Sequence, residues 1–402
     1  MHLSAVAVAP DGRVAIGGYY KGTLELGSSE PLSMATDHDG FAAVLDATGT
    51  IAWAHAFPGI GAQEVSGLAF LPNGSLLVQA ADDPTATSDT QSPSGAGFLA
   101  ALDRNGQPLF SHAISSGNVE PGNVVVGSDG NAIVCGTFAG SLEYQGLHLT
   151  RQDGCVYVLE LSPSGAGISA RALSAVECVA PPTIALDRRG NLFIEGRQSD
   201  VKTESGVVKA FDSSGASVFE RVFQGNPYAY AQGLTLDRAG GVLVDGAFTG
   251  TLDLGAGKWH SGPQIGGAFN YDGWVAKFSG AGALEWAHQY ANQGSQIGVS
   301  ATVAVADRSG NFILGIAAGA ALIEGEHSAP TTSASLSVLK LRPNGSKVWL
   351  QSLVSSTFDV EPTGIASDAN GNIWVVGDGG LALGNGAVGS ELFGAFLLEL
   401  AP

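Results

Sequence analysis

Three glutamates stand at the same place in a recurring segment of the sequence, where their carboxylates could bind a metal ion or move a proton. Glu64, Glu120 and Glu361 each lie ten residues before the glycine of a turn-like segment, and His2 holds the same place near the start of the chain. Carboxylate oxygens are the ligands that Ca²⁺ prefers, so these residues could hold Ca²⁺ or another hard cation. The same carboxylates could serve as the general acid and base of a hydrolase or lyase. The alternative is a solvated acidic rim on an acidic protein.

A second set of side chains could bind a ligand by stacking. Tyr228 and Tyr230 precede the longest connection in the sequence, residues 247–271, and Trp259 and His260 lie within it. Aromatic rings beside a concave polar surface can stack on sugar rings or on the side chains of a peptide. These four residues therefore predict a ligand pocket, which the three glutamates would help to line. The alternative is that the aromatic rings anchor the long loop to the core.

The cysteines could form one covalent crosslink. Cys135 is expected to end one strand and Cys155 to open the next strand of the same sheet. Side chains at facing ends of antiparallel neighbours could reach disulfide distance, and an exported protein would permit the bond. Two free, buried cysteines are the competing interpretation.

No sequence motif of a known catalytic site is present. The chain has no Gly-x-Ser-x-Gly, no His-Glu-x-x-His and no glycine-rich turn between a strand and a helix. Three histidines (His55, His112 and His288) recur at one position of the repeat, which makes each a poor candidate for a unique catalytic base. The sequence therefore favours a non-enzymatic binding or scaffolding module. A hydrolase or lyase that uses the three glutamates is the alternative.

Charge and composition exclude several classes of protein. The 402 residues include 18 Lys and Arg against 37 Asp and Glu, a net charge of −19, which argues against binding nucleic acid. No run of about 18 apolar residues is present, so no transmembrane helix is expected. The first ten residues carry no basic segment followed by an apolar run, so no signal segment is expected at the start of this chain.

Two series of glycine turns show which elements must position these residues. The first series has glycines at positions 12, 74, 130, 190, 240, 310 and 371, each after Asp, Asn or Pro and between two short apolar runs. The second series has glycines at positions 49, 106, 165, 215, 282 and 345. Apolar runs on both sides of such turns are typical of β-hairpins, so each repeat consists of four strands, A to D.

This repeat predicts an all-β fold, a seven-bladed β-propeller with four-stranded antiparallel blades in a single domain, 1–402. The blades are expected at about 3–60, 61–118, 119–177, 178–226, 227–294, 295–356 and 357–402. The last repeat stops where its second turn would begin. We therefore expect 27 strands, with blade 7 three-stranded and its outer edge open, and a natural precursor with an N-terminal extension.

Strand D carries an aromatic column. Trp53, Phe110, Phe219, Trp286 and Trp349 each stand four residues after a glycine of the second series. The same spacing in successive repeats predicts that these rings pack one blade against the next.

The outer segments of the repeats resemble a known family. The pattern is carried by Gly18-Tyr-Tyr20-Lys-Gly22, Gly136-Thr-Phe138-Ala-Gly140 and Gly246-Ala-Phe248-Thr-Gly250. It resembles the SBBP-type β-propeller repeats of bacterial secreted proteins and lipoproteins. The resemblance implies export, to the periplasm, the cell surface or the medium, and a binding or scaffolding role. The partner would be a carbohydrate, a peptide or a protein, held on the face that carries the long loops.

Overall fold

The structure is a computed structural model, and it describes residues 1–27, 31–59, 61–83, 95–173, 182–199, 203–255, 257–262, 270–291, 298–318, 322–323, 327–328, 335–355, 360–379, 388–392 and 394–402. These residues form strands and turns and no helix. The chain divides into two compact units, Met1–Ile184 and Ala185–Pro402, called here the N-terminal and the C-terminal unit.

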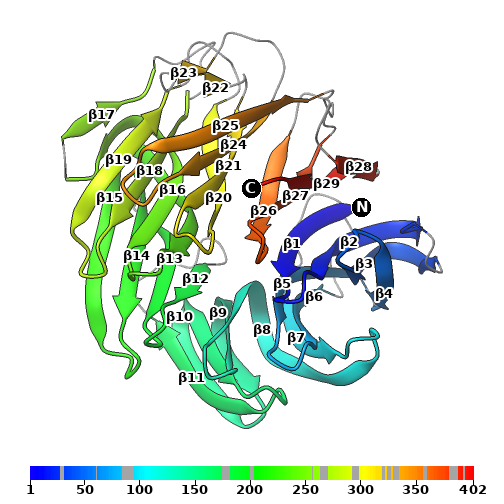
Figure 1. Ribbon diagram of the computed structural model, residues 1–402. Helices are drawn as coiled ribbons and strands as arrows, with labels where there is room; N and C mark the ends of the chain where they lie inside the picture. The colour runs from blue at the N-terminus through cyan, green and yellow to red at the C-terminus, as the bar shows by residue number, and fades with distance from the viewer. Residues whose placement is uncertain are drawn as a thin grey trace. The chain divides into compact units, whose positions relative to one another are not determined.

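The N-terminal unit contains two antiparallel sheets (Figure 1). Its strands are β1 (His2–Val8), β2 (Val14–Leu24), β3 (Leu32–Leu45), β4 (Ile51–Phe57), β5 (Ala62–Phe70), β6 (Leu76–Asp83), β7 (Gly95–Leu102), β8 (Pro108–Val126), β9 (Ala132–Tyr144), β10 (Leu147–Leu161) and β11 (Gly167–Leu173). β1 to β4 form one sheet in chain order, and β5 to β11 form the second, also in chain order.

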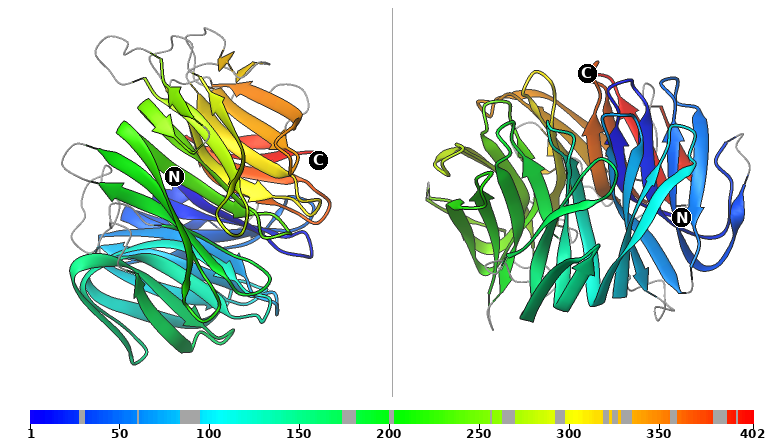
Figure 2. Two further views of the ribbon diagram at one scale, coloured as in Figure 1. Left: turned by 90° about the vertical axis from the view of Figure 1, so that its left-hand side faces the viewer. Right: turned by 90° about the horizontal axis from the view of Figure 1, so that it is seen from below.

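The C-terminal unit continues the same pattern. Its strands are β12 (Thr183–Leu186), which contains the boundary, β13 (Leu192–Ser199), β14 (Glu204–Phe211), β15 (Ser217–Leu236), β16 (Val242–Asp253), β17 (Lys258–His260), β18 (Asp272–Phe278), β19 (Leu284–Tyr290), β20 (Val299–Ala306), β21 (Phe312–Ala318), β22 (Leu322–Ile323), β23 (His327–Ser328), β24 (Ser335–Leu341), β25 (Lys347–Val354), β26 (Glu361–Ser367), β27 (Ile373–Asp378), β28 (Val388–Leu392) and β29 (Ala395–Leu400). The larger sheets have the orders β12-β13-β14-β15-β16-β18-β19, with β17 beside β16, then β20-β21-β24-β25 and β26-β27-β29-β28. Figure 2 shows the twist of the strands in these sheets from two further sides.

The hairpin turns predicted from the glycines are confirmed. In the turn after β15, for example, the Gly240 N–H donates to the Asp237 carbonyl (3.1 Å) and the Asp237 N–H donates to the Gly241 carbonyl (2.9 Å). The same pair of hydrogen bonds recurs in the other turns of both glycine series. Gly240 has a φ of 86°, a left-handed conformation that other residues adopt only with strain, and this requirement explains the glycine in each turn.

Two long strands join repeats into larger sheets. β8 and β15 each run from the last strand of one four-stranded repeat into the first strand of the next. β15 pairs with β14 through Ser217–Phe223 and Tyr228 and with β16 through Gln224–Leu236, with irregularities at Asn226 and between Ala231 and Gly233. Bulges of this kind bend a strand, which allows one continuous strand to serve two sheets.

The aromatic rings of strand D pack against the next repeat, as predicted. A Cβ on Gly106 would lie 2.7 Å from the ring of Trp53, and one on Gly282 would lie 2.8 Å from the ring of Phe219. The Trp53 indole N–H also donates to the Arg104 carbonyl in the same turn (3.0 Å). Each of these turns therefore needs glycine both for its backbone conformation and for the ring that covers it.

The prediction that the last blade has three strands is wrong. β28 pairs antiparallel with β29 and supplies a fourth strand, with Val388 opposite Glu399 and Leu392 opposite Ala395. β28 comes from the connection between β27 and β29 and reaches the outer edge through a tight turn at Gly394, whose φ is 93°. The predicted count of 27 strands is also wrong, since 29 strands lie in the described residues. The connections supply four extra strands, β17, β22, β23 and β28, whereas β8 and β15 are each one long strand where two were expected.

Candidate functional site

The three glutamates are divided between the two units. In the N-terminal unit, the Glu64 Oε1 lies 3.8 Å from the His2 Nε2, and the Glu120 carboxylate accepts a hydrogen bond from the Thr137 hydroxyl (3.4 Å). In the C-terminal unit, Glu361 begins β26 and is exposed. Among the described residues, no three His, Cys, Asp or Glu side chains gather closely enough to hold a metal ion. Glu64 and Glu120 lie in one unit and Glu361 in the other, so the calcium site suggested by the sequence stays a prediction.

Tyr228 and Tyr230 contact each other and their neighbours. Their rings stack with centroids 6.2 Å apart. The Tyr230 ring also lies 5.9 Å from the ring of Tyr271, and the guanidinium carbon of Arg197 lies 4.7 Å from the Tyr230 ring centroid. Burial, followed by hydrogen bonds to Tyr271 and Glu204, raises the pKa of Tyr230 well above its ordinary value. The cluster is thus held together by contacts among its own members.

Trp259 and His260 lie on the short strand β17. Trp259 stands opposite Leu252 of β16, is half-buried and packs against the hydrophobic core of the C-terminal unit. His260 is exposed, and its carbonyl accepts a hydrogen bond from the Gln289 amide (3.0 Å). The packing of Trp259 against the core agrees with the alternative that this ring anchors the long connection. Residues 263–269 of that connection lie outside the described residues.

The disulfide between Cys135 and Cys155 is not formed. Cys135 is a free, buried cysteine, and its thiol donates to the Pro182 carbonyl (3.3 Å). Cys135 pairs with Val158 across β9 and β10, whereas Cys155 pairs with Phe138. The two cysteines are therefore three positions out of register, about 10 Å along the strands, which exceeds the reach of a disulfide. The prediction failed because β9 and β10 extend beyond both cysteines instead of ending at them.

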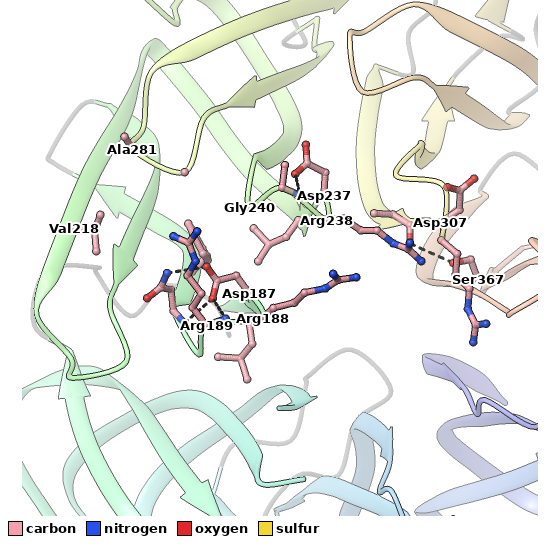
Figure 3. A pocket seen from close by; sticks show the side chains of 18 residues that line it. Asp187, Arg188, Arg189, Val218, Asp237, Arg238, Gly240, Ala281, Asp307 and Ser367 are labelled. Atoms are coloured by element: carbon pink, nitrogen blue, oxygen red, sulfur yellow. Dashed lines mark hydrogen bonds between the residues drawn. The ribbon is translucent and has the colours of Figure 1, made fainter. Parts of the chain in front are cut away.

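A pocket of about 840 Å³ lies in the C-terminal unit, at the turn ends of its strands. Its walls come from three successive turns of the first glycine series, within 186–191, 236–240 and 306–308, together with Phe193, Val218, the 280–281 turn and Ser367. The volume falls in the range typical of small-molecule binding sites. Figure 3 shows the labelled Arg188 and Arg238 reaching from neighbouring turns into the same open space.

The carboxylates in the pocket wall are all used to build the turns. One oxygen of Asp237 accepts the N–H groups of Ala239 and Gly241 (2.8 Å each), and the other lies 2.8 Å from the ammonium of Lys277. Asp187 and Asp307 accept the corresponding backbone N–H groups of their own turns. Their second oxygens are bound by Asn191 (2.7 Å) and by Lys340 (3.1 Å).

These contacts fix the charge of the carboxylates. Burial opposes the ionisation of Asp237, but the Lys277 ammonium and the N–H donors of the turn outweigh it and lower the pKa of Asp237. Burial likewise opposes the ionisation of Asp307, and hydrogen bonds from Asn311 together with Lys340 lower its pKa. Both carboxylates are therefore ionised and engaged at neutral pH, and neither is poised to accept a proton from a substrate.

The guanidinium groups in the wall are uncommitted. Arg188, Arg189, Arg238 and Arg308 are exposed. Within the described part of the chain, none of the four guanidiniums makes a hydrogen bond or an ion pair. Arginine stays protonated at every physiological pH, so it cannot act as a general base, but it can donate up to five hydrogen bonds to a bound group. The pocket therefore offers four exposed guanidiniums as hydrogen-bond donors.

The sequence contains a signal for this pocket, although the turns that carry it are short. Arginine follows the turn aspartate in three consecutive repeats: Asp187-Arg188, Asp237-Arg238 and Asp307-Arg308. In a chain with only 18 Lys and Arg, such repetition at one structural position marks a local concentration of positive charge. The predicted site at Tyr228, Tyr230, Trp259 and His260 lies on strand segments away from these turns.

Comparison with known proteins shows the fold. No family model and no curated protein matches the chain. Among solved structures, Sqt1 from Chaetomium thermophilum, bound to the N-terminus of the ribosomal protein L10, has a TM-score of 0.52 and 14% identity and covers 100% of this chain and 97% of its own. The β-propeller domain of the trilobed protease from Pyrococcus furiosus has a TM-score of 0.49 and 10% identity and covers 93% and 88%. A protein of unknown function from Bacteroides caccae has a TM-score of 0.40 and 14% identity and covers 71% and 81%.

None of the described residues forms a helix that is long and apolar enough to cross a membrane.

The antiparallel four-stranded repeats and the likeness to Sqt1 agree on one architecture. The chain is an all-β protein with a β-propeller fold.

Proposed function

We propose that this chain is a non-enzymatic binding module, a seven-bladed β-propeller in one domain that holds its ligand in the pocket between the hairpin turns of the C-terminal unit. The pocket carries the proposal, because its arginines are free to contact a ligand and its carboxylates are already engaged. Seven turns of the first glycine series with the same hydrogen bonds support the blade number.

Two further parts of the proposal rest on the sequence. The resemblance to SBBP-type repeats supports export, with a site of action in the periplasm, on the cell surface or in the medium. The partner is a carbohydrate, a peptide or a protein. The Sqt1 structure holds the N-terminus of a ribosomal protein, so peptide binding is known for a protein of similar fold.

A pocket-blocking variant tests the proposed function. Ala281 is exposed and lines the pocket, so Ala281→Trp fills the pocket without disturbing the core. Ala52, exposed on β4 of the N-terminal unit, provides the matched control Ala52→Trp. Purified wild-type chain is screened on printed glycan and peptide arrays, and every positive spot is measured again with both variants. We expect Ala281→Trp to abolish binding and Ala52→Trp to retain it. Equal binding by all three proteins would place the site elsewhere.

A further inference from the structure

The arginines that line the pocket indicate the chemistry of its ligand. Arg188, Arg238 and Arg308 occupy the same place in three successive turns, directly after the aspartate that organises each turn. Each turn is closed by two backbone hydrogen bonds and by two N–H donors to the aspartate, so the backbone that carries each arginine is held in place. Three guanidiniums from three separate elements thus line one space of about 840 Å³.

The charges of the wall leave an excess of positive charge. Asp237 is paired with Lys277 and Asp307 with Lys340, so neither carboxylate adds uncompensated negative charge to the wall. Lys277 also contacts Glu285, which is not part of the wall. Asp187 is the remaining carboxylate of the wall, against the four arginines that line the pocket. A positive pocket on a chain of net charge −19 is a local departure from the rest of the molecule. It favours an anion and disfavours neutral or cationic groups.

The number of arginines distinguishes between kinds of anion. A carboxylate is planar and presents two oxygens, which a single guanidinium can satisfy in a bidentate pair. A phosphate or sulfate group presents three free oxygens in different directions, so guanidiniums from different turns can share it. A cavity of this size also has room for a ring that bears several such groups.

We propose that the pocket binds a small molecule that carries several phosphate or sulfate ester groups, held by Arg188, Arg238 and Arg308. This inference rests on the proposed function for the location of the site and adds the class of ligand. Phosphate and sulfate esters share the chemistry that the arginines recognise, and the experiment separates them.

The test is isothermal titration of the full chain with two probes, inositol hexakisphosphate and sucrose octasulfate. Myo-inositol and sucrose are the matched neutral controls, and citrate represents carboxylates. We expect one or both of the charged probes to bind and the neutral sugars to give no signal. The stronger of the two probes identifies the ester. Binding of citrate with failure of both charged esters would overturn the inference.

Arginine variants then locate the binding. We expect the affinity for the probe to fall tenfold or more in each of Arg188→Gln, Arg238→Gln and Arg308→Gln. Arg238→Lys should lower the affinity several-fold, because lysine keeps the charge and loses the planar fork. Lys258→Gln removes one exposed positive charge on β17, outside the pocket, and is expected to change affinity less than twofold. The melting temperature of each variant verifies the fold. Equal weakening by Lys258→Gln and the arginine variants would show a general charge effect and contradict the site.

Failure of this inference is distinguishable from failure of the proposed function. If Ala281→Trp abolishes binding of an array ligand while neither charged probe binds the wild-type chain, the binding module stands and the oxyanion class is wrong. If the charged probes bind the wild type and Ala281→Trp equally well, the location of the site is wrong.

Discussion

At the scale of single residues, the most unusual group in the molecule is Asp245. It lies in β16 with no exposed surface, and neither carboxylate oxygen has a hydrogen-bond partner in the described structure. It stands opposite Gly233 on β15 and Val275 on β18. Burial without a compensating partner disfavours the charged form and raises the pKa of Asp245 to about 7.

The first prediction follows from this raised pKa. Because the folded state holds the proton more tightly than the unfolded state, the stability of the wild type should fall as the pH rises from about 4 to about 7 and change little above that. Asp245→Asn is neutral at every pH and should lose this dependence. At pH 8 we expect the variant to be more stable than the wild type by a few kcal/mol, and at pH 4 nearly equal to it.

Urea unfolding of both proteins at several pH values measures this difference. If Asp245→Asn is less stable than the wild type at pH 8, the raised pKa of Asp245 is contradicted. Such a result would mean that the ionised carboxylate has a stabilising partner.

Cys135 illustrates what residue types can and cannot predict. Its burial agrees with one of the two interpretations that the sequence left open, a free cysteine in the core. The failed alternative depended on where strands end and on their register. Register is decided by the bulge between Arg151 and Cys155 and by the length of β9 and β10, neither of which a sequence pattern reveals.

At the scale of elements, contacts between consecutive repeats stabilise the sheets. Trp53 is 9% exposed, covers Gly106 and donates to the Arg104 carbonyl. We predict that Trp53→Ala lowers the free energy of unfolding by about 3 kcal/mol, because it removes a packed ring and leaves a cavity. Leu109→Ala, at a residue 55% exposed, serves as the control and should change it by less than about 0.5 kcal/mol. A loss for Trp53→Ala as small as that of the control would show that the ring is not needed there.

The lysine beneath the second arginine turn provides another prediction. Asp237 and Lys277 are both nearly buried, 2.8 Å apart, and Lys277 also lies 3.0 Å from Glu285. Asp237→Asn removes one partner of a buried pair and should lower stability at pH 7 by about 3 kcal/mol. Glu285→Gln, at a side chain that is 42% exposed, should change it by less than about 1 kcal/mol.

The effect of Asp237→Asn should also depend on pH. The pKa of Asp237 is lowered in the folded state, so its stabilising effect is complete above the ordinary value of 3.8 and is lost as the pH falls below it. Thermal unfolding at pH 7 and at progressively lower pH should show the gap between wild type and variant closing below about pH 4. If the difference in stability between wild type and variant stays constant with pH, Asp237 stabilises the fold through its packing and not through its charge.

The hairpins were predictable from the sequence because their determinants are local. Gly240 and its equivalents need a positive φ, and apolar runs flank each of them, so turn and strands appear together in the sequence. The arginine pocket was not predicted. Its residues lie in turns, and nothing in one turn alone shows that three successive turns line a common space.

At the scale of the whole molecule, the final sheet shows how an edge is covered. β28 was missed because its segment, Val388-Gly-Ser-Glu-Leu392, has a weak strand pattern, and its pairing is decided by the free edge of β29. An unpaired edge is a site for aggregation, so a strand taken from the neighbouring connection protects the sheet.

Replacing Val388–Leu392 by a Gly-Ser segment of equal length should therefore lower the melting temperature by several degrees and increase light scattering on heating. The double variant Leu322→Ser/Ile323→Ser is the control and should have a smaller effect, because within the described residues β22 pairs only with β23. A melting temperature unchanged by the loss of β28 would mean that the edge needs no cover.

The central claim is that the turns of the C-terminal unit, rather than the tyrosines and the long connection, form the binding surface. Hydrogen–deuterium exchange of the chain with and without inositol hexakisphosphate or sucrose octasulfate tests it most directly. We expect slower exchange of amides in 186–191, 236–240 and 306–308 on addition of the probe that binds. Protection confined to 228–230 and 258–260, with no change in the three turns, would contradict the claim.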